Sequence, residues 1–272
     1  MTPDARAPVA EGSAAGRVGR GVYVYGVVAA AGDREAVAER GVGSPPAPVR
    51  VVEGERLSAL VSDVRAGWEA AGREDVEAHD RVLSHVVERS AIVPMRFGVV
   101  MDSDDQVRAT LLERHSDEIA ALLEHVEGRV QMSVKAFYVD ESLLRETLRR
   151  SPDLKRRSDA LRDRPVEATQ NERIALGRDV AEAVEHQRAA DERLLAEPLA
   201  TVADEVQVHP PASDRIALNA QLLVPRDGRS KLDDLVRRLS VEHADRFTFR
   251  YVGPLAPFSF TSLSLDAEES WD

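Results

Sequence analysis

Strand and helix patterns alternate along this chain in two successive series, and this order limits the folds that it can adopt. In the first series the strand patterns are β-branched or aromatic, and the helix patterns place apolar residues at helical spacing. In chain order, these patterns occupy 22–28, 49–54, 57–64, 74–91, 92–100 and 103–128. The order β-β-β-α-β-α predicts a modified ferredoxin-like α/β sandwich at 21–128.

The second series starts after Gly128 with the alternating strand MSVKAFYV. Strand and helix patterns follow in the order β-α-β-β-α-β, which is that of a ferredoxin-like unit. They occupy 132–139, 169–197, 205–208, 216–224, 230–241 and 247–252. We therefore expect an α+β protein with a second domain at 129–262, which includes a basic helical connector at 141–165, and an internal structural repeat.

Three helix starts can be read from capping pairs. Ser103 precedes Gln106, Thr169 precedes Glu172 and Ser230 precedes Asp233, each by the three residues of a capping box. Apolar side chains at helical spacing then predict the buried face of each helix. These faces include Val76, Leu83 and Val87 in one helix, Val107, Leu111, Ile119, Leu122 and Val126 in the next, and Ile174, Val180, Val184 and Leu194 in the long one.

The amino-acid composition limits the cellular compartments in which this chain is expected. The first residues, 1–20, are rich in Ala, Gly, Pro and Arg without the apolar centre of a secretory signal, so they predict a disordered lead, and 263–272 forms an acidic tail. The longest apolar run is too short for a membrane helix, which needs about 20 residues. The chain has no cysteine, which excludes disulfides and thiolate metal sites and suits the reducing cytoplasm.

Charge argues against nucleic acid as a partner. The formal net charge is −12, which would repel phosphate backbones over most of the surface. One stretch, 141–165, is basic, but it contains interspersed carboxylates and no aromatic residues for base stacking. We interpret it as a solvated connector.

The histidines are scattered, and none has a second histidine at the i,i+4 spacing of a helical zinc site. His79 lies on an apolar helix stripe, where it could act as a base or ligand, although a hydrogen-bonded histidine at the edge of a core is the simpler interpretation. We therefore predict no catalytic residues, no metal and no cofactor.

Two segments stand out without carrying reactive groups. In IVPMRFG, a proline within an apolar strand indicates a sheet edge or bulge, and a charge lies beside an aromatic ring. In GPLAPFSF, prolines stiffen the chain between aromatic anchors, which would either cover the second core or bind a partner. The candidate structural or partner-binding residues are His79, Pro94, Arg96, Phe97, Gly98, Gly253, Pro254, Pro257, Phe258, Ser259 and Phe260.

These segments, together with the tyrosine-rich strand VYVYGVV, make the chain similar to the gas vesicle protein GvpL/GvpF family. The resemblance covers roughly 22 to 260 in matching order. It includes a helix with a histidine near its start, VPMRFG, and a C-terminal G-P-x-x-P-[FY]-S-F. The chain departs from the family in having Leu255-Ala256 where Trp-Pro is frequent and Phe258 where Tyr is frequent.

The resemblance implies a non-enzymatic accessory or minor structural protein, required for gas vesicle assembly and located at the gas vesicle within the cytoplasm. Its implied partners are the apolar shell protein, which it would protect from aggregation as a chaperone does, and other gas vesicle accessory proteins. An alternative from the fold pattern is a regulatory module that binds a small molecule between its ferredoxin-like units.

Overall fold

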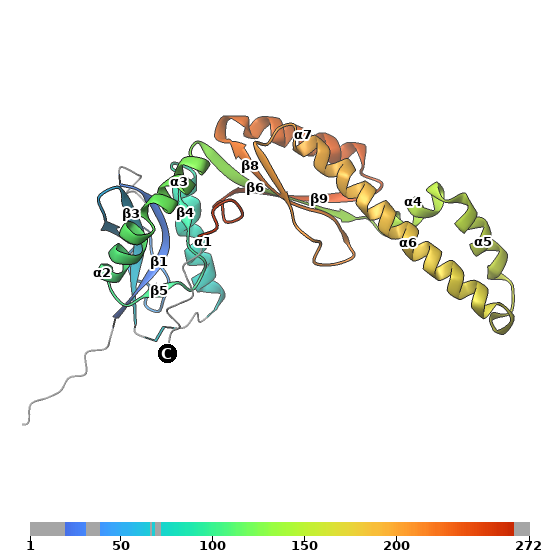
Figure 1. The fold of residues 1–272 in the computed structure, drawn as a ribbon, viewed down its shortest axis with the longest axis horizontal. Coiled ribbons are helices and arrows are strands. Elements are labelled where there is room, and N and C mark those ends of the chain that lie inside the picture. The colour runs from blue at the N-terminus through green and yellow to red at the C-terminus, as the bar shows by residue number, and fades with distance from the viewer. Residues whose placement is uncertain (1–19, 31–38, 66, 69–71, 264–272) are drawn as a thin grey trace, which may run out of the picture.

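The computed structural model describes residues 20–30, 39–65, 67–68 and 72–263. The predicted lead at 1–20 and acidic tail at 263–272 therefore lie, apart from Arg20 and Leu263, outside the described residues. The rest is an α+β protein with two domains, each built on its own sheet, arranged as an elongated arch (Figure 1). The domain boundaries at 128 and 262 remain predictions.

The N-terminal sheet is antiparallel in every pairing, in the order β2-β3-β1-β4, and β5 also pairs with β1. Its strands are β1 (Arg20–Ala29), β2 (Arg50–Glu53), β3 (Leu57–Arg65), β4 (Val93–Pro94) and β5 (Val100–Met101). The β-branched run and the hairpin expected from the sequence are therefore present.

Strand β1 is buried on both faces, which explains its nearly continuous apolar sequence. Val22 and Val24 face one apolar cluster, while Tyr23 and Tyr25 face another. A bulge changes the alternation, because Val24 pairs with Val61 and Gly26 with Leu60, which leaves Tyr25 as the extra residue. Tyr23 and Tyr25 share a face because they are two residues apart, and the bulge reverses the alternation after them, so that Val27 faces the cluster of Val22 and Val24.

Helices cover both faces of this sheet. Helix α1 (Arg73–Val87) packs on the tyrosine side, and the other side is covered by α2 (Asp104–Val107), the π-helix η2 (Arg108–Arg114) and α3 (Ser116–Val126). Ser103 accepts a hydrogen bond from the Gln106 amide at 3.2 Å, which confirms the predicted helix start.

The strand predicted at 92–100 is wrong as a single element. Only 93–94 and 100–101 pair with β1, and the chain turns between them. Gly98 has φ +96°, a left-handed conformation that glycine adopts without a steric penalty. Pro94, in the short β4, cannot donate to a sheet hydrogen bond.

The C-terminal sheet has the order β7-β8-β6-β9, again antiparallel throughout. This is the strand order of a ferredoxin-like unit, and the N-terminal sheet repeats it. The strands are β6 (Arg129–Tyr138), β7 (Glu205–Val208), β8 (Ile216–Pro225) and β9 (Phe247–Leu255). Helices α6 (Val166–Leu199) and α7 (Arg229–Glu242) lie along one side of the sheet, and the short 3-10 helix η3 (Arg226–Gly228) precedes α7 (Figure 1).

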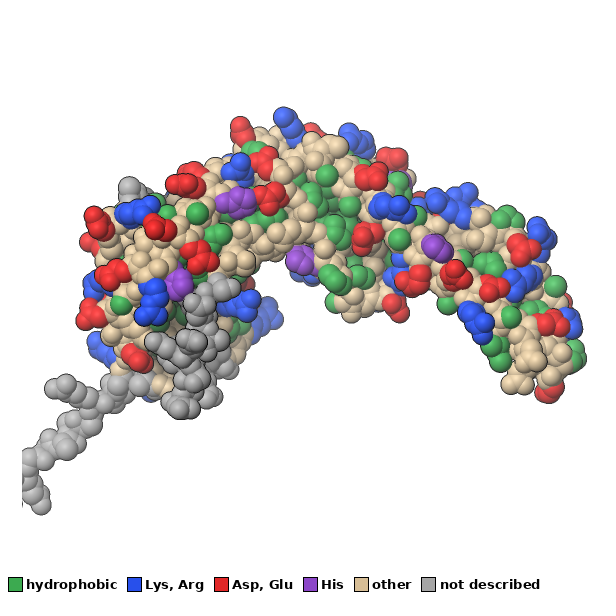
Figure 2. Space-filling model, viewed as in Figure 1, with side chains coloured by type: hydrophobic (Ala, Val, Ile, Leu, Met, Phe, Trp, Pro, Cys, Tyr) green, Lys and Arg blue, Asp and Glu red, His purple; other side chains and the backbone are tan. Residues whose placement is uncertain are grey.

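The predicted basic connector forms two helices, α4 (Ser142–Arg150) and α5 (Pro152–Arg162), which pack beside the part of α6 that extends beyond the sheet (Figure 1). Ion pairs neutralise much of its positive charge. They join Glu146 to Arg149 and Arg150, Asp153 to Arg156, Asp159 to Arg162, Asp179 to Arg157, and Glu172 to Arg164. Figure 2 shows acidic and basic side chains interspersed along the visible face of the arch.

Several predicted helix details are wrong. Helix α6 begins at Val166, and the Thr169 hydroxyl lies inside it, where it donates to the Pro165 carbonyl at 2.9 Å. Ile174, expected on a buried face, is 55% exposed because it lies where α6 projects from the body. Leu194 is 38% exposed for another reason, since Leu195 and Leu199 occupy the buried face of the helix there. Two smaller expectations also fail, since Val76 is 41% exposed and Ser230 lies within α7 without capping it.

The two domains are joined by one apolar cluster that contains residues of α1 and β1 as well as β6 and α7. Of the helices in the described part of the chain, none is long and apolar enough to cross a membrane.

Candidate functional site

A cluster of aromatic rings lies where the two domains meet, and we call it the aromatic junction. Its members come from β1, the loop after β3, α1, the turn between β4 and β5, and the segment after β9. They are Tyr23, Tyr25, Trp68, His79, Phe97 and Phe258. The fold thus brings together three of the candidate residues named from the sequence, His79, Phe97 and Phe258.

The Tyr23 hydroxyl is the centre of the hydrogen bonding. It lies 2.8 Å from His79 Nδ1 and accepts a bond from the Gly98 amide at 3.2 Å. The hydroxyl proton is free for Nδ1, so Tyr23 donates to His79, and the neutral imidazole carries its own proton on Nε2. The turn that holds Gly98 is thereby tied to β1 and α1.

His79 is 2% exposed, which places it in the core rather than in an open site. Burial lowers the pKa of His79 below its usual value, and the Asp80 carboxylate partly opposes this effect. Nε2 has no well-formed hydrogen bond among the described residues, although the Met95 backbone lies close enough to favour the charged ring slightly. The neutral, enclosed ring supports the interpretation of His79 as a core histidine.

Tyr25 forms a second buried bridge. Its hydroxyl accepts a bond from the Val42 amide at 2.8 Å and lies 2.8 Å from Ser62 Oγ. Burial raises the pKa of both Tyr23 and Tyr25. Both phenols therefore stay protonated and serve as fixed structural donors and acceptors.

The segment after β9 crosses to the N-terminal domain. Phe258 stacks near His79, with ring centroids 6.5 Å apart, and is 41% exposed. The next amide, of Ser259, donates to Gln131 Oε1 at 3.0 Å, and Phe260 is buried in the apolar cluster of the N-terminal sheet and α3. The segment therefore contributes to both cores, because Ala256 is buried in the cluster that contains β6 and α7 whereas Phe260 enters the first core.

The other candidate residues have separate roles. Pro94 is buried in β4 opposite Gly26, while Arg96 is exposed and makes no ion pair with another described residue. Pro254 is the last residue but one of β9, and Pro257 is buried, where its carbonyl accepts a bond from the Thr261 hydroxyl at 2.7 Å. Gly253 packs so closely on Met132 that a Cβ would lie 2.4 Å from its sulfur.

Two contacts, one in the aromatic junction and one between the domains at the end of α1, were not predicted. Trp68 packs edge-on against Tyr23 with centroids 5.2 Å apart. The available signal in the sequence was a large aromatic residue in a short segment of mostly Ala and Gly. Arg226, just after β8, donates to the carbonyls of Val87 and, at 3.0 Å, Ser90 at the end of α1. No sequence spacing reveals this contact, since the partners are far apart along the chain.

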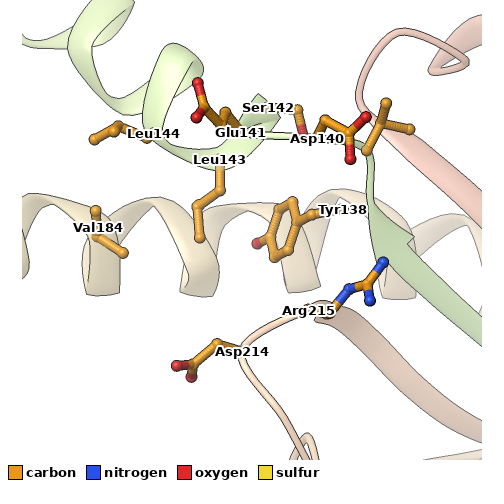
Figure 3. Close-up of a pocket in the computed structure, with 10 residues that line it drawn as sticks. Tyr138, Asp140, Glu141, Ser142, Leu143, Leu144, Val184, Asp214 and Arg215 are labelled. Carbon is orange, nitrogen blue, oxygen red and sulfur yellow. The ribbon is translucent and has the colours of Figure 1, made fainter.

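A hollow of about 380 Å³ lies elsewhere, between α4, α6 and the adjoining ends of β6 and β8 (Figure 3). Tyr138 comes from β6, Leu143 points from α4 toward α6, and Val184 lies on α6 itself. Residues of the C-terminal domain alone line it, so it does not support a ligand site between the two units.

The aromatic junction holds rings and backbone in place rather than a reactive group. Its histidine is enclosed and its phenols are protonated. Among the described residues, no group of three histidine, aspartate or glutamate side chains could hold a metal ion.

Comparisons with known proteins agree with the fold. Residues 21–262 match the family model described as gas vesicle synthesis protein GvpL/GvpF. A relative named gas vesicle protein F, from Streptomyces sp. (strain CB03234), is 34% identical over 88% of this chain and 98% of its own. Another gas vesicle protein F, from Haloferax mediterranei, is 25% identical over 91% of this chain and 96% of its own.

Solved structures have the same fold. The crystal structure of GvpF from Anabaena sp. PCC7120 aligns with a TM-score of 0.78 at 24% identity, covering 90% of this chain and 99% of that one. GvpF from Microcystis aeruginosa aligns with a TM-score of 0.73 at 24% identity, covering 89% and 99%. The family resemblance predicted from the sequence is confirmed, and the chain belongs to the gas vesicle synthesis protein GvpL/GvpF family.

Proposed function

We propose that this protein is a cytoplasmic, non-enzymatic assembly factor that binds the apolar gas vesicle shell protein and other accessory proteins, and keeps the shell protein from aggregating before it is incorporated. The names of its relatives support a gas vesicle role. A charged body that offers a limited apolar surface suits such a partner, because it stays dispersed while it covers apolar groups.

The observation that carries the proposal is the presentation of Phe258. Its ring is 41% exposed, yet its position is fixed by His79 beneath it, by the Ser259 bond to Gln131 and by the burial of Phe260. A rigid aromatic side chain loses little conformational freedom on binding, which is why such residues dominate binding energies. The guanidinium of Arg96, which makes no ion pair with another described residue, lies next to Phe97 in the sequence and adds a second exposed group.

The test is a binding titration of purified shell protein with the Phe258→Ala and Arg96→Gln variants. We expect affinity to fall by about tenfold or more for Phe258→Ala, equivalent to ~1.4 kcal/mol. The matched control is Val241→Ala, which removes an exposed apolar group on α7 that is 75% exposed. Equal affinities for folded Phe258→Ala, Val241→Ala and the unchanged protein would refute the site.

Function in cells can be tested with the same variants. A strain whose own gene is deleted should regain gas vesicles with the Val241→Ala protein and form far fewer with Phe258→Ala. Normal vesicles in the deletion strain without any copy would rule out an assembly role.

A further inference from the structure

One face of the C-terminal sheet is covered only at one end, where Leu223 packs in the cluster of the N-terminal sheet and α3, and no described helix packs on it around Lys135. Val134 and Ala136 of β6 point into the apolar cluster with α7, so the alternate residues, including Lys135, point to the other face. Helices α6 and α7 both lie on the first side (Figure 1). The part of this second side around Lys135 and Arg250 is therefore open to a partner, whereas Gln131, Ser133 and Leu223 on the same side are buried.

A row of three polar residues crosses this open face. Lys135 pairs directly with Asn219 of β8 on one side and with Arg250 of β9 on the other. Directly paired residues in antiparallel strands share a face, with Cβ atoms about 5 Å apart. Two cations thus stand side by side, an arrangement that destabilises an isolated sheet.

The side chains of this row lack partners within the described part of the chain. Lys135 and Arg250 make no ion pair there, and the side-chain oxygen of Asn219 is buried without a hydrogen bond. The neighbouring polar groups behave differently, because Gln221 donates to Ser133 Oγ at 3.1 Å and accepts from Gln131 at 3.0 Å. The side chains of the row thus lack partners among the described residues, whereas the polar side chains beside them are hydrogen-bonded to one another.

Apolar groups flank the row. Phe137, two residues from Lys135, is half-buried, and Val252, two residues from Arg250, is 40% exposed. Both lie on the open face by the alternation of a strand. The surface therefore offers two adjacent positive charges between apolar side chains.

We propose that this row binds an acidic, extended segment of a protein partner, with carboxylates on Lys135 and Arg250 and apolar side chains on Phe137 and Val252. The complementarity is local, since the chain as a whole carries a charge of −12. A long polyanion such as nucleic acid would be repelled beyond the row, whereas a short carboxylate segment would contact the row alone. The row does not include Phe258, although Gln131 on the same sheet face accepts a bond from the amide of the neighbouring Ser259, and the proposal does not depend on binding of the shell protein.

The experiment uses a fluorescein-labelled peptide of alternating Glu and Val residues, titrated with the full-length protein at low salt and followed by fluorescence anisotropy. We expect the Lys135→Gln/Arg250→Gln double variant to bind about tenfold more weakly. The matched control, Lys231→Gln/Arg238→Gln, removes the same charges from exposed positions on α7 and should leave binding unchanged. Thermal melts should show that both variants fold, since the first relieves repulsion between paired like charges and the second changes only exposed side chains.

Three results would overturn the proposal. The first is equal weakening in the two double variants, which would indicate a general charge effect. The second is equal binding of a Lys-Val peptide or tighter binding of single-stranded DNA. The third is a marked gain in peptide affinity when Asp266, Glu268 and Glu269 are changed to their amides, which would assign the row to the chain's own acidic tail.

Discussion

The hydroxyl of Tyr23 lies 2.8 Å from Nδ1 of His79 and links β1 to α1 beneath Phe258. Tyr23→Phe would leave Nδ1 and the Gly98 amide without their bond to this hydroxyl. We expect a loss of about 1–3 kcal/mol in the free energy of unfolding. The control is Tyr251→Phe, whose hydroxyl donates to Asp233 at an exposed position and should cost less. Urea unfolding measures both, and similar losses would contradict the buried network.

The lowered pKa of His79 predicts a dependence of stability on pH. In the unfolded chain the His79 ring takes up a proton near pH 6.5, whereas the ring in the folded protein resists protonation. The contribution of His79 to the free energy of unfolding is therefore full above about pH 6.5 and falls as the pH decreases. We expect the urea midpoint to drop between pH 7.5 and 5.5 by more in the unchanged protein than in His79→Gln. Parallel pH profiles would show that His79 is not desolvated.

Phe258 and Phe260 should differ although they are two residues apart. Phe260 is 6% exposed in the core of the N-terminal domain, so Phe260→Ala should cost about 3–5 kcal/mol of unfolding free energy. Phe258→Ala should cost much less, because its ring is 41% exposed. Denaturant melts of both variants compare these losses, and equal losses would indicate that Phe258 belongs to the core.

Two glycines should respond in opposite directions to alanine. Gly253 has φ +155°, and a Cβ there would meet Met132, so Gly253→Ala should lower the melting temperature. Gly177 lies inside α6 with open space around a Cβ, so Gly177→Ala should stabilise the helix by up to ~1 kcal/mol. A stabilised Gly253→Ala variant would mean that the close packing on Met132 is not maintained in solution.

The sequence predicts much of the secondary structure where local signals agree. Strand 205–208 is observed as predicted and strand 216–224 with one residue more, because apolar alternation and flanking turns limit them. The start at Ser103 is confirmed because its capping partner is local. Strand 92–100 fails because Gly98 turns the chain out of the sheet, and periodicity does not show where a turn interrupts pairing.

The aromatic junction was not predicted from the sequence, because it is formed by residues that lie far apart along the chain. His79, Phe97 and Phe258 each stand out in the sequence, but their convergence depends on how two domains dock. The face of α6 is misjudged at Ile174 because a helix that leaves the body can expose apolar residues that periodicity alone assigns to a core. The Arg226 contact with the end of α1 has no local signature at all.

The burial of Phe260 among residues of β1 and α3 affects the order in which the chain can fold during synthesis. Ribosomes add about 5–20 residues per second and usually release N-terminal domains to fold first. Here the first core lacks one of its aromatic side chains until nearly the whole chain has been made. The domain that is translated first is therefore completed last, and a chain cut short before GPLAPFSF would expose the place that Phe260 fills.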